Sequence, residues 1–584
     1  RGTTWERVSD FNPRSFYFST VCVDPTNAEK VYLLGWQVYV SDDGGKTFRA
    51  GLAKKLHVDH HAMWINPEDP DHIIDGNDGG LYVTYDGGAA WDFHNHMAVG
   101  QFYNVDADDS DPYRVGGGLQ DNGSWIGPSE TIRASSGRWS REGSIWNGDW
   151  IDIWGGDGFH VSFCSADPNI VYAESQGGNI GRIHLDTGEK YKIQPSPKEG
   201  QPRMRWNWNA PFFVSPHEPT RLYLAGNSVF RLDERGDRWE RISEDLSRNE
   251  VDKVTTVGSE AETYGTVVSL AESPIVEGML WAGTDDGLIH LTTNGGETWE
   301  DVTPDVVDRR YISKIEPSHH ARDAAYIAVD GHWSDDFAPL LLMTTDAGET
   351  WTEITGNLPD GWPPMVIRED QKNPDVLYVG TEQAAWISID RGERWVKLNS
   401  DDLPTVPVDD LKIQRTRQDL VAGTHGRSIW ILDDITPLSQ LTDEVLQMTL
   451  HVFEPRPALP RYHLDLGAMY GDRGFVAKNP PMGAIITYWL RDDVNETIKV
   501  TITDGEGRKI RELTGTGRPG MNRVVWDLQA EEKLRLGNPH DLPEFVPVGE
   551  YTVKVSYKVD DETHESTTTV EVRAAPGKSD GEGE

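Results

Sequence analysis

The chain has 584 residues, of which 96 are acidic and 55 basic, so its formal net charge at pH 7 is −41. A field of this sign repels nucleic acid and anionic membranes, and both are therefore excluded as expected partners. No apolar run approaches the ~18 residues of a membrane span, and the length supplies several hydrophobic cores.

A short turn phrase recurs from the N-terminus onward. Four clear copies span residues 41–48, 84–91, 292–299 and 344–351, looser copies span 232–239 and 388–395, and residues 1–5 read as the tail of another. Each copy ends in Trp or Phe, and neighbouring ends in the unbroken parts of the series lie 43 to 60 residues apart. Periods near this size are typical of β-propellers, in which one four-stranded blade takes about 40–50 residues.

The phrase has a mechanical explanation. Its Asp or Asn side chain accepts hydrogen bonds from main-chain N–H groups in a tight turn, and the Gly residues supply positive φ. The closing aromatic residue is large enough to pin the hairpin against a neighbouring sheet. We therefore interpret the aspartates of the phrase, such as Asp43, Asp86 and Asp346, as structural residues.

A second repeat pairs two apolar strands across a Pro-containing turn, as in residues 23–35 and 373–380. The two repeats together give about nine blade-like units, which begin near residues 15, 57, 100, 150, 208, 264, 311, 363 and 408. Rings usually hold 4–8 blades. We therefore predict that residues 1–95 are the last blades of one propeller, whose other blades lie upstream, and that residues 96–437 form a complete seven-bladed propeller. A single larger ring is the alternative.

The sequence pattern changes after Pro437, where the blade-like repeats end. Residues 438–464 are predicted to be a linker, and residues 465–575 a β-sandwich with strands near 484–490, 498–504, 521–528, 549–557 and 567–573. Residues 576–584 are rich in Gly and acidic residues, which predicts a disordered tail. Cys22 and Cys164 precede similar Asp-Pro turns in different blades, and we expect two buried thiols rather than a disulfide.

The phrase Ser/Thr-x-Asp-x-Gly-x-Thr-Trp resembles the Asp-box (BNR) repeat of sialidases, sortilin-like proteins and xyloglucanase-type glycosidases. Residues 59–64, 119–123 and 423–430 strengthen a resemblance to bacterial Asp-box proteins labelled glycosyl hydrolase or sortilin-like. Residues 520–527 and 547–553 resemble the FlgD-like immunoglobulin domain, a C-terminal appendage of exported bacterial proteins. The resemblance implies an all-β propeller with an Ig-like sandwich, secreted to the cell surface or the periplasm.

One histidine-rich segment, residues 56–64, lies at the entry to a blade-like unit. Strict strand alternation would place His57, Asp59 and His61 on one face, with His60 opposite. Imidazole and carboxylate ligands suit a divalent metal such as zinc, manganese or iron. A divalent metal is therefore the one cofactor that the sequence suggests, and a polar plug at the ring centre is the alternative.

Other phrases place acids, amides and indoles between glycines. Trp faces, amides and carboxylates are the groups that sugar rings need for stacking and hydrogen bonding. The candidate ligand-binding residues are Gln120, Asn122, Trp125, Asn179, Trp208, Asn209, Trp333 and Arg427. A glycosidase needs two carboxylates roughly 5–9.5 Å apart, and the candidate catalytic residues are Asp78, Asp121 and Asp157. For each phrase, plain turn chemistry is the alternative.

Two functions follow from these patterns. The first is a non-catalytic extracellular scaffold that binds a glycan or a polypeptide at the propeller face. The second is a glycoside hydrolase that uses paired aspartates in a propeller cleft. A metal-dependent hydrolase built on the His57–His61 segment is a third interpretation.

Overall fold

The structure is a computed structural model of the chain. It describes residues 3–14, 17–18, 20–132, 139–140, 144–197, 204–250, 252–253, 263–398, 403–464, 471–531 and 545–574. The chain divides into two compact units, Arg1–Val99 with Gly467–Val476, and Gly100–Leu466 with Ala477–Glu584. In the described parts of the chain no helix has the length and apolar character needed to cross a membrane.

The first unit contains two four-stranded antiparallel sheets in simple meander order. Their strands are β1 (Val21–Asp24), β2 (Asn27–Leu33), β3 (Tyr39–Ser41) and β4 (Arg49–Ala50), followed by β5 (His60–Ile65), β6 (Ile73–Asn77), β7 (Gly80–Thr84) and β8 (Asp92–Phe93). The two sheets share one core, in which Tyr32 and Leu34 of the first meet Ile65 and Ile73 of the second.

The second unit begins with seven consecutive antiparallel sheets, six of four strands and a last one of three. The first sheet contains β9 (Phe102–Ala107), β10 (Arg114–Leu119), β11 (Gly123–Pro128) and β14 (Ile151–Trp154). The next two contain β15 (Gly158–Phe163), β16 (Ile170–Ser175), β17 (Asn179–His184) and β18 (Lys190–Lys192), then β19 (Phe212–Val214), β20 (Leu222–Ala225), β21 (Val229–Asp233) and β22 (Arg238–Arg241). The short strands β12 (Trp139–Ser140) and β13 (Ile145–Trp146) lie between β11 and β14.

The remaining four sheets continue the pattern. They contain β23 (Val267–Glu272), β24 (Leu280–Thr284), β25 (Ile289–Thr292) and β26 (Glu300–Asp301); β27 (Tyr311–Pro317), β28 (Ala325–Asp330), β29 (Leu340–Thr344) and β30 (Thr352–Glu353); β31 (Pro364–Glu369), β32 (Leu377–Thr381), β33 (Ala385–Ser388) and β34 (Val396–Lys397); and β35 (Val408–Ile413), β36 (Leu420–Thr424) and β37 (Ser428–Leu432). The unit start predicted near residue 150 falls on β14, which completes the preceding sheet. The other predicted starts lie within a few residues of the first strands.

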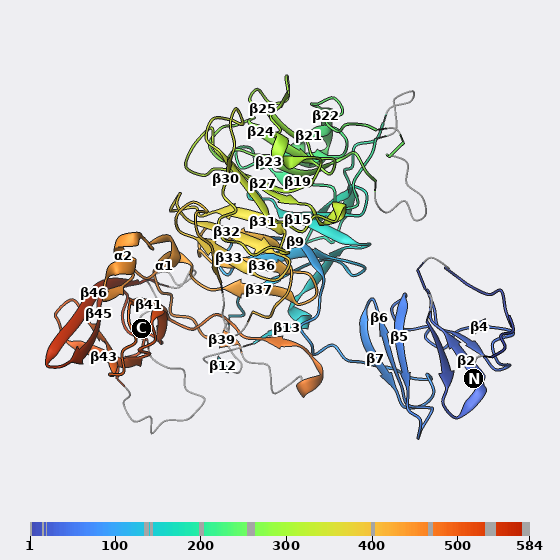
Figure 1. Cartoon of the computed structure of the whole chain (residues 1–584). Helices are drawn as coiled ribbons and strands as arrows, with labels where there is room; N and C mark the ends of the chain where they lie inside the picture. The colour runs from blue at the N-terminus through green and yellow to red at the C-terminus, as the bar shows by residue number, and fades with distance from the viewer. Residues whose placement is uncertain are drawn as a thin grey trace. The chain divides into compact units, whose positions relative to one another are not determined.

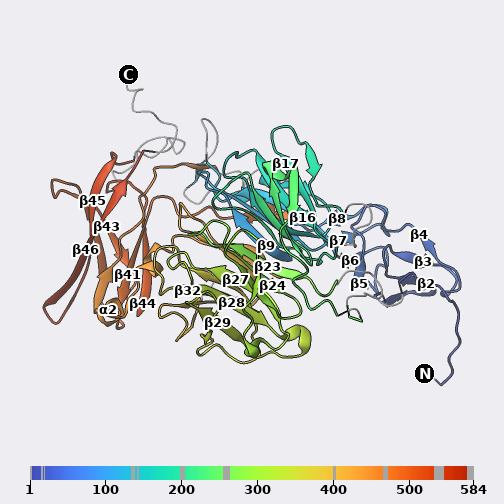
Figure 2. The same cartoon turned by 90° about the horizontal axis from the view of Figure 1, so that it is seen from above.

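These seven sheets close into a ring. The first strand of each sheet packs against the first strand of the next, from β9 through β15, β19, β23, β27 and β31 to β35, and β35 packs back against β9. Figures 1 and 2 show the sheets following one another in chain order around a common centre. A separate hydrophobic cluster fills the space between each pair of neighbouring sheets. The predicted fold class, an all-β propeller followed by a β-sandwich, is confirmed.

The repeated turn phrase acts as a staple, by which we mean that its Asp side chain bonds groups of the same turn and holds the hairpin closed. In the first copy, Oδ1 of Asp43 accepts the backbone N–H groups of Lys46 and Thr47 at 3.0 and 2.9 Å, and its Oδ2 accepts the Thr47 hydroxyl at 2.7 Å. Hydrogen bonds from Thr47 and Ser41 hold the pKa of Asp43 well below its ordinary value. Gly44 and Gly45 have φ of 72° and 88°, the region that glycine adopts without strain.

In three copies the closing tryptophan also joins its blade to the one before it. The indole N–H groups of Trp299, Trp351 and Trp395 donate to the backbone carbonyls of Ile242, Val302 and Ile354 at 2.8, 2.9 and 3.0 Å. Each acceptor lies three residues after the closing tryptophan of the preceding copy. The phrase is therefore a clamp between blades as well as a staple within one.

After the ring come two short helices and the sandwich. The helices are α1 (Thr436–Ser439) and α2 (Asp443–Gln447). One sandwich sheet has the order β38-β41-β44 and the other β43-β42-β45-β46. Their strands are β38 (Leu450–Val452), β41 (Ala484–Leu490), β42 (Ile498–Thr503), β43 (Lys509–Gly515), β44 (Gly520–Trp526), β45 (Gly549–Val559) and β46 (Glu562–Val572). Alternate residues of both sheets form one core around Trp526 and Tyr488.

The structure differs from the sequence analysis in the connecting segments. Residues 438–464, predicted to be a linker, include β38, which pairs with β41 and extends the sandwich. Leu438, Leu441 and Val445 of the same segment pack into the core of the last two blades, because the three-stranded last sheet leaves apolar surface for them to cover. Cys22 and Cys164 are both free thiols, as expected, but only Cys164 is buried, whereas Cys22 is half-buried. The predicted tail, residues 576–584, lies outside the described residues.

Candidate functional site

The centre of the ring is filled by charged side chains of the innermost strands. Arg368 of β31 bonds Glu316 of β27 at 2.9 Å and Asp410 of β35 at 2.8 Å. Lys314 lies 3.4 Å from Asp410, and Lys412 of β35 lies 2.7 Å from Asp106 of β9. These pairs, which we call the axial plug, join four first strands across the ring.

The plug is desolvated and electrostatically paired. Burial alone would raise the pKa of Glu316, but Arg368 and His319 outweigh it and hold that pKa below its ordinary value. Burial, assisted by the charges of Lys314 and Arg368, lowers the pKa of His160 on β15 to about 3, so this imidazole is neutral at pH 7. A network of this kind, whose charges are mutually compensated, closes the axis rather than offering free ligand groups.

One end of the ring carries the turns that follow each second strand. In five blades the first residue of this turn donates its backbone N–H to the carbonyl of the residue just before the first strand of the same blade. These bonds are Gln120 to Gln101 (3.1 Å), Gln176 to Asp157 (3.2 Å), Asp285 to Thr266 (3.0 Å), Glu382 to Pro363 (3.3 Å) and His425 to Pro407 (3.0 Å). The same bond in five blades fixes these turns at one end of the ring, which we call the mouth.

Two histidine–aspartate pairs lie at the mouth. Nδ1 of His332 lies 2.6 Å from Oδ2 of Asp330, and Nδ1 of His425 lies 2.8 Å from Oδ2 of Asp409. The hydrogen bond to Asp330 raises the pKa of His332, and that to Asp409 raises the pKa of His425. Burial raises the pKa of Asp409 despite its imidazole partner.

Glu382 completes this cluster. Burial raises the pKa of the Glu382 carboxyl, the charges of His332 and His425 lower it, and those of Asp330 and Asp409 raise it, with a net upward shift. Glu382 thus shares one electrostatic environment with both pairs. The mouth therefore brings together two imidazoles and two carboxyls, those of His332, His425, Glu382 and Asp409, whose pKa values are all raised.

Aromatic and amide groups surround the cluster. The Tyr103 hydroxyl donates to Oε1 of Gln120 at 2.8 Å, and its ring meets His425 edge-on with centroids 5.7 Å apart. Burial raises the pKa of Tyr103 to about 12, so this hydroxyl is protonated at neutral pH. Trp333 is 64% exposed, and its ring lies 4.7 Å from that of His332. An exposed indole beside buried polar groups is a surface on which a ring can stack.

Several residues singled out from the sequence do meet at this end. Oδ1 of Asp157 accepts the backbone N–H of Asp121 at 3.1 Å, and Oδ1 of Asn209 accepts the Asn104 amide at 3.2 Å. Together with Gln120, these residues belong to the turns and first-strand entries that form the mouth. Asp121 and Asp157 are thus in contact, although the contact runs through the backbone of one and the carboxylate of the other.

Other candidates have local structural roles. The Trp125 indole donates to the Asn122 carbonyl at 2.7 Å, and the Asn179 amide donates to the Ser175 hydroxyl at 2.8 Å. Each bond stabilises the turn in which its residues lie. The Trp208 carbonyl accepts the N–H of Gly177 at 3.2 Å. Arg427 is exposed on the same turn as His425.

The histidine-rich segment belongs to the first unit. Strand β5 begins at His60, so His57 and Asp59 precede it and the alternation that would align them with His61 does not exist. His60 is buried and lies 2.8 Å from Asp75, while His61 lies 3.1 Å from Asp78. The described residues contain no group of three or more His, Cys, Asp and Glu side chains arranged to hold a metal ion. The strand alternation on which the metal prediction rests is therefore absent, and Asp78 lies in a different unit from Asp121 and Asp157.

Sequence reasoning missed most of the mouth cluster. The missed residues are Tyr103, Asp330, Glu382, Asp409 and His425. A signal was present in the repeat, because Asp285, Glu382 and His425 each follow a Gly-Thr pair that ends a second strand. Aligning the blades on that pair would have placed these three side chains at one end of the ring.

The sequence matches no protein-family model, and no curated protein matches it. Among solved structures it is similar to PorZ, an essential bacterial surface component of the type-IX secretion system of Porphyromonas gingivalis, at 13% identity and a TM-score of 0.41 over 95% of this chain and 75% of that one. YCF48 from Cyanidioschyzon merolae shares 12% identity, with a TM-score of 0.34 over 63% of this chain and 93% of that one. The GH74 enzyme of Niastella koreensis shares 13% identity, with a TM-score of 0.25 over 87% and 74%. No residue role is carried over from them.

Proposed function

We propose that this protein is a binding scaffold that recognises a neutral glycan at the mouth of its seven-bladed propeller. The observation that carries the proposal is the convergence of an exposed indole, Trp333, with carboxylates and amides that several blades contribute to one end of the ring. Indole faces stack on sugar rings, and amides and carboxylates bind sugar hydroxyls. The acidic cluster disfavours uronates and sulfated sugars by charge repulsion.

The axial plug supports a scaffold rather than a channel. Its ion pairs close the ring beneath the mouth, so a ligand at the mouth rests on a rigid floor made by the innermost strands. A site whose groups are held by secondary structure loses little entropy on binding. We place the protein outside the cytoplasm, where such glycans are met.

A second candidate function is glycoside hydrolysis at the same mouth. The observation that favours it is the grouping of the Glu382 carboxyl with those of Asp330 and Asp409 at the mouth, since a glycosidase uses two carboxyl groups of which one has a raised pKa, as Glu382 has. Asp121 and Asp157 remain the aspartate pair proposed from the sequence.

The test is calorimetric titration with a panel of neutral oligosaccharides, together with a sugar-release assay. Trp333→Ala should weaken binding by about 5- to 10-fold, since stacking on an aromatic ring contributes on the order of 1 kcal/mol. Trp36→Ala is the matched control, because Trp36 is also exposed, at 56%, and lies in the first unit. Release of sugar that Glu382→Gln abolishes would establish the hydrolase. An unchanged affinity in Trp333→Ala would reject the glycan site.

We also propose that the first unit is the end of another propeller, with boundaries near residues 1–95, 96–437 and 465–575 for the three folded parts. Val21 and Val23 of β1 are 57% and 52% exposed, so one face of the first sheet has apolar side chains without a covering sheet in its own unit. A further blade of the same kind is the partner that such a face fits.

A further inference from the structure

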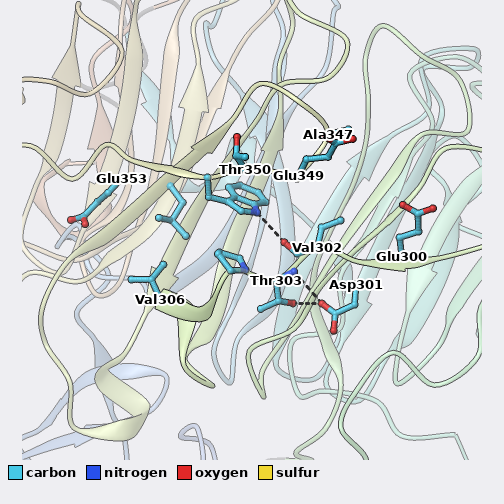
Figure 3. Close-up of a pocket in the computed structure, with 13 residues that line it drawn as sticks. Glu300, Asp301, Val302, Thr303, Val306, Ala347, Glu349, Thr350 and Glu353 are labelled. Carbon is cyan, nitrogen blue, oxygen red and sulfur yellow. Dashed lines mark hydrogen bonds between the residues drawn. The ribbon is translucent and has the colours of Figure 1, made fainter.

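A groove of about 730 Å³ opens on the outer rim of the ring between two neighbouring blades. It lies between β26, the outermost strand of one blade, and β30, the outermost strand of the next. Its walls also include the turn that precedes β30 (Figure 3). The groove belongs to the rim and shares no residue with the mouth.

The groove carries negative charge and no positive charge. Four of its thirteen lining residues are carboxylates and none is Lys, Arg or His. The carboxylates are those of Glu300, Asp301, Glu349 and Glu353, and all four residues are exposed. Within the described part of the chain none of the four has an ion-pair partner. In Figure 3, Glu300 and Glu353 lie toward opposite ends of the groove, with Val302 between them.

The missing counter-charges are a local feature of these two blades. The outermost strands of the two preceding blades contain cations, since β18 reads Lys-Tyr-Lys and β22 reads Arg-Trp-Glu-Arg. Rim carboxylates there are paired, as Glu240 is with Arg231 at 2.8 Å. By contrast β26 reads Glu-Asp and β30 reads Thr-Glu. The acidity of the groove is therefore more than the average acidity of the chain.

Apolar surface lies between the carboxylates. Val306 is 45% exposed, and Val302 and Trp351 line the groove beside it. The Trp351 indole N–H is already bonded to the Val302 carbonyl, so its ring offers an apolar face. Acidic ends around an apolar middle are complementary to a basic chain segment with an apolar residue at its centre.

We propose that this groove is a docking site for a basic polypeptide segment of a partner protein, bound in an extended conformation with Lys or Arg on either side of an apolar residue. Two unpaired edge strands border the groove, and an extended chain can lie along such edges. The partner's cations would meet four carboxylates that lack cations of their own. The site is independent of the mouth and does not rest on the proposed function.

The test uses a fluorescein-labelled nonapeptide in which lysine and arginine flank a central leucine, with a glutamate-substituted peptide as the control ligand. Fluorescence anisotropy is measured on the full chain. Glu349→Lys should weaken binding by about 10-fold, because it adds a like charge inside the groove. Glu297→Lys is the matched control, since Glu297 occupies the same place in the preceding copy of the turn phrase and does not line the groove. Its affinity should stay within about twofold of the wild type.

Two outcomes would overturn the proposal. Equal weakening by Glu349→Lys and Glu297→Lys would mean that the peptide only senses the overall charge of −41. Absence of binding by the wild type at low salt would mean that the groove does not take such a segment. Val306→Ser, which leaves the charge unchanged, should weaken binding if the apolar centre contributes, and loss of Trp333 should have no effect on this peptide.

Discussion

The clamp between blades predicts the effect of replacing Trp395 by Phe. The Trp395 indole donates to the Ile354 carbonyl at 3.0 Å, and its side chain is 2% exposed. Phe keeps a ring in place but removes the N–H, so the buried Ile354 carbonyl loses that donor. We expect the clamp between these two blades to weaken without loss of the fold.

The magnitude follows from the hydrogen bond alone. A lost hydrogen bond costs about 1 kcal/mol, and leaving a buried partner unsatisfied raises the cost to about 2 kcal/mol. A change of this size corresponds to about 30-fold in an opening equilibrium. Hydrogen exchange of the β33 and β34 amides should therefore accelerate by roughly that factor when exchange is limited by local opening.

The chain supplies a matched control at Trp91. This tryptophan closes an earlier copy of the phrase, but its indole nitrogen is buried and has no hydrogen-bond partner among the described residues. Trp91→Phe removes an unsatisfied donor and should leave exchange in its own sheet unchanged or slower. If Trp395→Phe and Trp91→Phe have the same effect, the tryptophans act only through ring volume, and the inter-blade hydrogen bond is unimportant.

Three further predictions concern other parts of the fold. Gly295→Ala should lower stability by about 1 kcal/mol in thermal unfolding, because Gly295 has φ of +71° although no atom would clash with the added methyl. Glu130→Gln should cost about 3 kcal/mol, since Glu130 is buried and bonded to Arg461 at 2.5 Å. Burial alone would raise the pKa of Glu130, but its hydrogen-bonded and cationic partners outweigh burial and lower that pKa. The stabilisation by Glu130 is therefore fully present above about pH 4.3, the pKa of an unfolded Glu, and is lost as the pH falls through the lowered pKa. Asp330→Asn should lower the pKa of His332 in an NMR titration, and an unchanged value would show that the pairing does not raise it.

The local repeats were readable from the sequence for a physical reason. A turn such as residues 41–48 depends on side chains that bond their own backbone, and glycine supplies the positive φ, so a short segment contains all the groups that the turn needs. Alternating apolar residues likewise predicted the strands of the sandwich, although β43 was missed. In β43 every residue is exposed or half-buried, so its sequence shows no strong alternation.

The mouth could be predicted only in part. Gln120, Asp157 and Asn209 stood out because glycines or indoles flank them, whereas Glu382 and Asp409 sit in ordinary strand-turn sequence. Their importance comes from neighbours on other strands and turns, such as His332 for Glu382 and His425 for Asp409. The metal hypothesis rested on strand geometry for His57 and Asp59, which precede the strand.

The sequence by itself determined the repeat, the staples and the all-β class, because each rests on bonds within a few residues or on a period along the chain. Only the tertiary structure decided which side chains share a site. Closure of the ring brings Asp106 of the first sheet to Lys412 of the last, and it fills the axis with paired charges. The same closure gathers the turns of different blades at one mouth and leaves one rim groove without cations. Such features depend on contacts between blades, which no local pattern records.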